Sequence, residues 1–180
     1  MTAASVTAVP SAATRAVGLL GAAWGVAGIS VLLLGGVISM GPYAMELSWA
    51  ELSGLQRGVL IGYLAFMIGG KGYMGFHRGF SPRAASRARE IAREPRPLRV
   101  LLAPLYSMSL IQAPVGRLVR SWGLLLIIAA IVPVVKILPW PWRGIVDAGV
   151  VAGLSVGLLS FWWFVAVKPL LEPIENMRET

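Results

Sequence analysis

The chain has 180 residues, of which 57% are hydrophobic and only 13% are charged. Soluble domains carry roughly 25% charged residues, so this composition excludes a soluble globular domain as well as a disordered chain. The lack of cysteine excludes a disulfide scaffold and a thiolate nucleophile, and the single histidine, His77, disfavours a histidine-based metal site. We therefore predict an all-α integral membrane protein without a metal or cofactor.

The net charge is +8, from 16 Lys and Arg against 8 Asp and Glu. In a soluble protein this excess would suggest binding to nucleic acid, but here the basic residues lie between long apolar runs. The lipid bilayer, with its anionic lipids, is therefore the predicted partner, and nucleic acid is not. Enrichment in Arg, Ala and Gly is typical of a GC-rich genome, which favours a bacterial inner membrane as the location.

The first predicted span follows a small, polar stretch at residues 1–14, which we expect to be a flexible tail. Residues 16–38 contain no charged side chain and exceed the roughly 20 residues that a transmembrane helix needs. This run is too long for the apolar core of a signal peptide, so we expect it to be retained as a helix. Gly41 and Pro42 are expected to end it.

A second predicted span covers about 56–76 and is interrupted by Lys71. The stretch 77–99 that follows is the most arginine-rich part of the chain, and we expect it to form a basic loop with a short basic helix. That helix is expected to begin at Ser81 and Pro82, since Ser is a favoured N-cap and Pro a favoured first residue. Its thin apolar stripe consists of Ala84, Ala88, Ile91 and Ala92, and Pro95 and Pro97 are expected to stop it.

The segment 100–116 is ambiguous, because it is apolar but contains two prolines and several polar residues. Two further spans are predicted at 121–138, with Pro133 as a kink, and at 145–167, and they complete a membrane domain at 15–168. Residues 169–180 are a predicted C-terminal tail.

The distribution of basic residues predicts the orientation of the chain. With the 77–99 loop in the cytoplasm and 100–116 as an interfacial or re-entrant segment, four spans place most basic residues, and both termini, inside. The alternative is a fifth span at 100–116. It would move four basic residues to the wrong side of the membrane, namely Arg117, Arg120, Lys168 and Arg178.

Two spans carry stripes of small residues, which allow membrane helices to approach closely. The members in the first span are Gly18, Gly21, Gly25 and Gly28, and those in the last are Gly149, Gly153 and Gly157. We expect the first span to pack against the last through these stripes. The alternative is that one stripe docks another subunit, as in a homo-oligomer or a complex with a membrane protein partner.

Three polar residues lie within or at the edge of the spans. Lys71 either extends toward the cytoplasmic surface or faces the bundle interior, where it binds an anion or transfers protons. His77 titrates near neutrality, so it serves either as an interfacial structural residue or as a pH sensor or proton shuttle. Asp147 either pairs with Arg143 one turn earlier, at a helix N-terminus that favours an anion, or forms an entry site.

The arginine loop sets the topology and is a candidate binding site for anionic lipid, with Arg78, Arg83, Arg87, Arg89 and Arg93 as the predicted residues. We find no catalytic motif in the sequence. The favoured function is therefore a non-enzymatic accessory or scaffold component that binds anionic lipid or a membrane protein. The alternatives are a small oligomeric transporter or channel that uses Lys71 and His77, and a membrane-embedded lipid-modifying enzyme.

Overall fold

The computed structural model describes residues 11–167, which contain helices and no strand. The elements in chain order are α1 (Ala12–Met45), η1 (Trp49–Glu51), α2 (Gly54–Ala65), η2 (Phe66–Phe80), α3 (Ser81–Arg93), α4 (Pro97–Leu101), α5 (Ala103–Ser107), α6 (Val115–Lys136), α7 (Trp142–Trp162) and η3 (Trp163–Val167). The predicted all-α class is confirmed. The tail predicted at 169–180 and residues 1–10 of the tail predicted at 1–14 lie outside the described residues.

Four helices in the described range are long and apolar enough to cross a membrane, as predicted. They are Ala12–Met45, Gly54–Arg93, Val115–Lys136 and Trp142–Val167. The ambiguous segment 100–116 forms no such helix, because Pro104 and Pro114 divide it into short pieces, of which α5 has only five residues. The five-span alternative is therefore wrong.

The second long helix differs most from the prediction. Gly54–Arg93 is one continuous helix of 40 residues, so the basic region 77–99 begins as a helical extension of the span and not as a loop. Ser53 starts this helix with a capping box, in which its side chain and that of Gln56 each accept a backbone N–H. No break occurs at Ser81, so its predicted role as an N-cap is wrong.

The continuity arises in the glycine-rich element η2, a π-helix of 15 residues. π-helices are rare and mostly short, with hydrogen bonds between residues five apart. The Ser81 N–H still bonds to the Phe76 carbonyl, five residues earlier, and α-helical bonding follows it. Pro82, which has no N–H to donate, therefore lies at the change of hydrogen-bond register, where a helix tolerates it.

The first helix is also longer than predicted. It begins at Ala12, where the Ser11 side chain accepts the Thr14 N–H, and it continues through Pro42 to Met45. The expectation that Gly41 and Pro42 end the helix is wrong by one turn, since Pro42 still accepts the N–H of Glu46. The third and fourth spans likewise begin earlier than predicted, at Val115 and Trp142.

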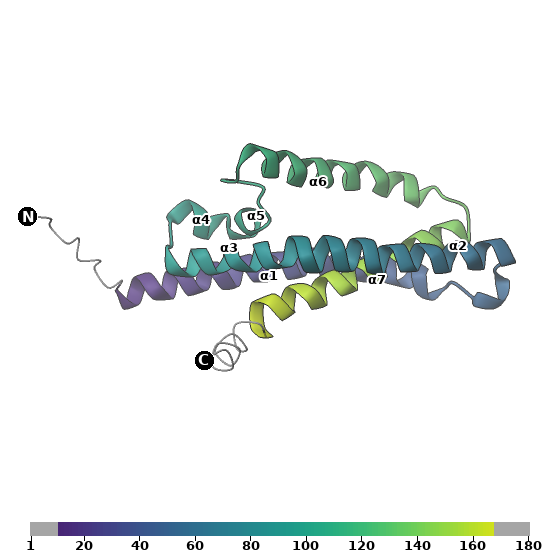
Figure 1. Cartoon of the computed structure of the whole chain (residues 1–180), viewed down its shortest axis with the longest axis horizontal. Helices are drawn as coiled ribbons and strands as arrows, with labels where there is room; N and C mark the ends of the chain where they lie inside the picture. Colours follow the sequence, from purple (N-terminus) through teal and green to yellow (C-terminus); the bar gives the residue numbers. More distant parts are fainter. Residues whose placement is uncertain (1–10, 168–180) are drawn as a thin grey trace, which may run out of the picture.

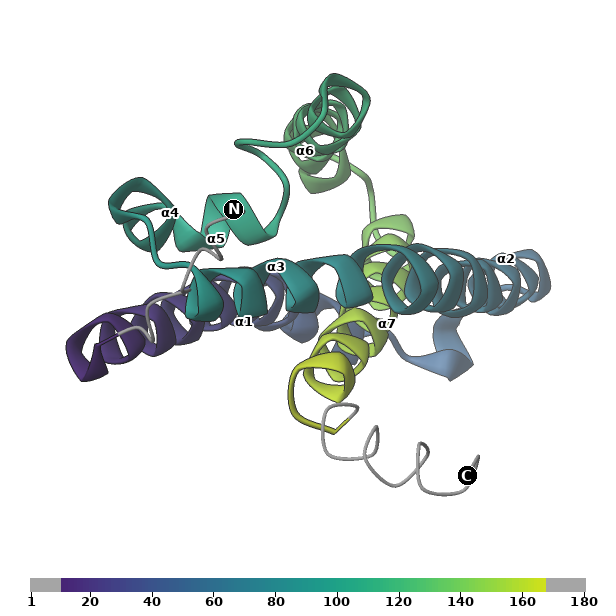
Figure 2. The same cartoon turned by 60° about the vertical axis from the view of Figure 1, so that its left-hand side comes forward.

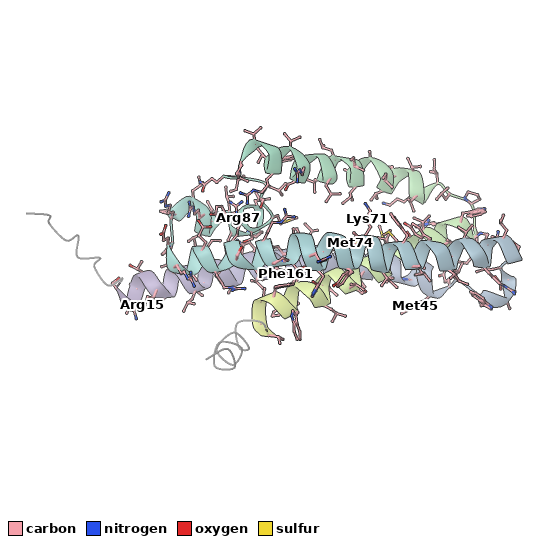
Figure 3. All side chains as sticks on the ribbon, viewed as in Figure 1. Arg15, Met45, Lys71, Met74, Arg87 and Phe161 are labelled. Atoms are coloured by element: carbon pink, nitrogen blue, oxygen red, sulfur yellow. The ribbon has the colours of Figure 1, made fainter. Side chains whose placement is uncertain are left out.

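Helices α1 and α7, together with the long helix α2–η2–α3, form the packed part of the molecule (Figure 1). Their largest shared core cluster contains Ile29, Leu33, Ala84 and Phe161, of which Phe161 is fully buried (Figure 3). Helices α4 and α5 fold back onto the first half of α1 and onto α3. Pro133 lies inside α6, which contains no buried residue and stands apart from the other long helices in both views (Figures 1 and 2).

The two glycine stripes do not face each other. A side-chain carbon added at Gly18 would lie 2.5 Å from the backbone oxygen of Ala92 in α3, and one at Gly28 would lie 2.5 Å from Pro104 in α5. The α7 stripe faces the second long helix, with Gly149 against Tyr63. The first span does pack extensively against the last, as expected. The contact is not made through the stripes, because each stripe instead admits part of the 54–107 region that lies between them in the sequence.

Candidate functional site

The arginines gather at one end of the molecule, which we call the basic end and define as residues 78–120. It comprises α3, α4, α5 and the first turns of α6, and it contains nine arginines and two glutamates. Its position follows from the packing of α3 to α5 on the first half of α1 (Figures 1 and 2). The five arginines of the predicted lipid-binding set all lie here, but the structure gives them different roles.

Arg87 is turned into the protein. Its guanidinium donates hydrogen bonds to the Ser109 hydroxyl (3.1 Å) and to the carbonyl oxygens of Gln112 (2.9 Å) and Ile111 (3.4 Å). It also lies 3.9 Å from the centre of the Tyr106 ring, in a cation–π contact. The side chain therefore binds α3 to the loop that leads from α5 to α6.

That loop has an unusual backbone, which explains why it needs support. Ser109 and Gln112 adopt positive φ angles of 61° and 48°, which residues other than glycine rarely adopt. Both residues are partners of Arg87. The arginine thus stabilises a turn that the local sequence does not favour.

Two further arginines of this end are engaged within the chain. Arg89 donates to the backbone carbonyl of Phe164 at the end of the last span (2.9 Å), and Arg99 forms an ion pair with Glu90 (2.9 Å) and binds the Gln112 side chain (3.0 Å). Arg87 therefore has little capacity left for a lipid headgroup, whereas Arg89 commits one of its N–H groups to the fold. Their roles need residues far apart in the chain, which the sequence pattern alone does not indicate.

The other three arginines of the predicted set, Arg78, Arg83 and Arg93, are exposed. Arg83 uses its Nε to bond the Gly79 carbonyl, which directs the rest of its guanidinium outward. Three more arginines of the basic end are also exposed, namely Arg96, Arg117 and Arg120. These six arginines present positive charge to the surroundings. Of the two glutamates of the basic end, Glu90 forms an ion pair with Arg99 and Glu94 does not.

Tyr106 lies between Arg87 and Arg99 and is almost fully buried. Burial, and then the neighbouring Glu90 carboxylate, raise the pKa of its phenol, while Arg87 acts in the opposite direction. The ring is therefore neutral at physiological pH and offers both guanidinium groups a π face. Sequence analysis did not single out Tyr106, since it lies 19 residues from Arg87.

Lys71 lies within the second span on an exposed position of η2. Its neighbour Gly72 packs against Val156 of α7. Along the axis of that helix, Val156 lies about 10 Å from Trp163 and about 21 Å from Trp142. Its ammonium group lies 5.9 Å from the centre of the Phe66 ring, which is on the side away from the basic end. The side chain therefore neither extends toward the basic end nor faces the interior of the packed helices, so neither of the two predicted orientations is found.

His77 lies between helices, where its Nδ1 is 2.9 Å from the Ser160 hydroxyl of α7. Its ring stacks on Tyr73 and contacts Phe164. The imidazole is half-buried and joins η2 to α7. This geometry matches the structural role among the two predicted for it.

Asp147 is buried at the opposite end of α7, and its carboxylate is 3.7 Å from the Arg143 guanidinium. Arg143 also lies 3.6 Å from the centre of the Tyr43 ring in α1. Asp147 and the Ser160 partner of His77 are 13 residues apart on one helix, which is about 20 Å. Lys71, His77 and Asp147 are therefore not brought together at one site.

Within residues 11–167, no group of three His, Asp or Glu side chains is placed so that it could hold a metal ion. Comparison with protein-family models, with curated proteins and with solved structures finds no match to this chain. The fold and the composition define the class: a multi-pass helical membrane protein with four candidate spans, which imply contact with the lipid bilayer.

Proposed function

We propose that this chain is a non-enzymatic accessory component of a bacterial inner membrane that binds anionic phospholipid through its basic end. The observation that supports the proposal is the exposed arginine set along α3, with Arg78 just before the helix, Arg83 in its first turn and Arg93 at its end. Each basic residue near an anionic surface contributes roughly 1 kcal/mol at low salt. The buried arginines support the same function indirectly, because they fix the fold of the surface that carries the exposed ones.

The positive-inside rule places this end in the cytoplasm, together with both termini. Headgroups of the inner leaflet would then lie beside the exposed arginines. The separation of Lys71, His77 and Asp147 supports the accessory role over a transporter or an enzyme, because transport or catalysis would use several polar groups at one depth.

A lipid-competition experiment tests this proposal. The purified chain is mixed with equal amounts of phosphatidylglycerol and phosphatidylcholine, and the lipids that remain bound are counted by native mass spectrometry. We expect the triple substitution of Arg78, Arg83 and Arg93 by Gln to lower the preference for phosphatidylglycerol by up to about a hundredfold, from three contributions of roughly 1 kcal/mol.

The control replaces the same three residues by Lys, which keeps the charge and should keep most of the preference. All three positions are exposed, so neither variant disturbs the packed core. An unchanged preference in the Gln variant would show that these arginines do not bind lipid and would refute the proposal.

A further inference from the structure

Helix α6 is an apolar helix with few neighbours among residues 11–167. None of its residues is buried, and most of its large side chains are exposed, including Leu124, Leu126, Ile127, Ile128 and Ile131. Near its start, Ser121 and Trp122 bond to the carbonyls of Met108 and Leu110, which anchors that end alone. Membrane helices normally pack closely on others, so the exposed apolar side chains of α6 are available to one more helix.

Lys71 is the charged residue on the neighbouring helix, η2. Its side chain points to the side of η2 on which α6 lies (Figure 3). Phe66 and Met74 surround it on the helix surface and are more than half exposed. A cation at this depth is costly in hydrocarbon and calls for an anionic partner.

The described part of the chain does not supply that partner. Among residues 11–167 the ion pairs with carboxylates are those of Arg99 and Arg143, at the two ends of the molecule. Asp147 is the one acidic residue within the apolar runs of the sequence; it is buried and lies nine residues, or about 14 Å, along α7 from the level of Lys71. A second copy of the chain has the same distribution of charge and would not supply a carboxylate at this depth either.

A lipid headgroup is also a poor match, because headgroups lie at the surface of the bilayer. The Lys71 ammonium is directed toward Phe66, away from Trp163, which is the nearer end of α7 to Lys71. We infer that the space between α6 and η2 receives a transmembrane helix of a different protein, which carries an Asp or Glu inside the bilayer opposite Lys71. This inference does not depend on lipid binding by the basic end, since Lys71 lies outside residues 78–120.

Model helices test the inference without knowledge of the natural partner. Leu–Ala peptides of about 20 residues, with one central Glu or an isosteric Gln, are reconstituted with the full chain in phosphatidylcholine bilayers. Association is measured by energy transfer to a dye on the chain. The dye is attached to the variant Glu51→Cys, whose introduced cysteine is unique because the chain contains no other cysteine. We expect the Glu peptide to bind about tenfold more tightly than the Gln peptide.

Variants of the chain assign the effect to Lys71. Lys71→Met should abolish the preference for Glu, Lys71→Glu should transfer it to a peptide with a central Lys, and the matched control Lys136→Met, at the end of α6, should leave it unchanged. A photo-reactive leucine beside the peptide Glu should cross-link to both η2 and α6. A Glu preference that survives in Lys71→Met would overturn the inference.

Three other outcomes would also overturn it: equal binding of the Glu and Gln peptides, cross-links that avoid α6, and Lys71-dependent association of two copies of the chain. Displacement of the Glu peptide by added phosphatidylglycerol would show that a headgroup occupies the site instead. Lys71 is exposed, so its substitutions do not disturb the core. Since Lys71 is not among the residues substituted in the lipid-competition experiment, failure here leaves the lipid-binding proposal untouched.

Discussion

At the scale of single residues, the nine arginines of the basic end divide into two groups with different chemistry. Arg87 shows the structural use: its flat guanidinium stacks on Tyr106 while its N–H groups reach two carbonyls and a hydroxyl. Lysine cannot reproduce this arrangement, because its ammonium is compact and does not stack. Exposed arginines such as Arg93 need only a positive charge.

We therefore predict that Arg87→Lys lowers the free energy of unfolding by about 2 kcal/mol, because it leaves several acceptors of the Ser109–Gln112 turn without a charged donor. Arg93→Lys is the matched control, with an expected change within about 0.5 kcal/mol. Both are measured by denaturant titration in detergent micelles. Equal changes in the two variants would show that the turn does not depend on the guanidinium.

At the scale of elements, the glycines of α1 set how closely other segments approach. A methyl group at Gly18 would meet the backbone of Ala92, which cannot rotate away as a side chain could. At Gly35, in the same helix, no atom lies within 4 Å of the added carbon. The two positions therefore separate the effect of packing from that of helix propensity.

We predict that Gly18→Ala destabilises the protein by about 1–3 kcal/mol, since α1 and α3 must separate. Gly35→Ala should stabilise it by about 0.5–1 kcal/mol, because alanine favours a helix over glycine. Thermal unfolding in micelles reports both values. If Gly18→Ala were as well tolerated as Gly35→Ala, the close contact between α1 and α3 would be disproved.

The sequence was a good guide to which segments form long helices but a poor guide to where they end. Runs without charge predict spans because hydrocarbon excludes charged groups. The Ser81–Pro82 boundary failed because the helix continues through a glycine-rich π segment, whose hydrogen-bond register leaves no trace in the hydrophobic pattern. The predicted partners of the glycine stripes were also wrong. A spacing of three or four residues shows which helix face carries small residues, but it does not show which segment packs on that face.

At the scale of the whole molecule, positive charge is concentrated at the basic end, while the acidic residues Glu46, Glu51 and Asp147 lie outside it, after α1, in η1 and near the start of α7. Charge asymmetry of this kind orients membrane proteins during insertion. The exposed arginine surface was predictable as a group from the sequence. Its division into buried and exposed members was not, because Arg87 and Arg89 find their partners 22 to 75 residues away.

The orientation is open to a direct test, since the chain contains no cysteine. We predict that Glu51→Cys reacts with a membrane-impermeant maleimide in intact bacterial cells, whereas Ser86→Cys reacts only after the membrane is permeabilised. Both positions are exposed, so access to the reagent depends on the side of the membrane. The reverse labelling pattern would invert the topology and place the arginines outside.

The unbroken helix from Gly54 to Arg93 couples the bilayer to the arginines mechanically. With 40 residues it is longer than the roughly 30 Å hydrocarbon layer requires, and its charged half is a direct continuation of its apolar half. Spans adjust to bilayer thickness by tilting. Because the helix is continuous, α3 tilts together with the span. The height of its arginines above the headgroups therefore changes with membrane thickness.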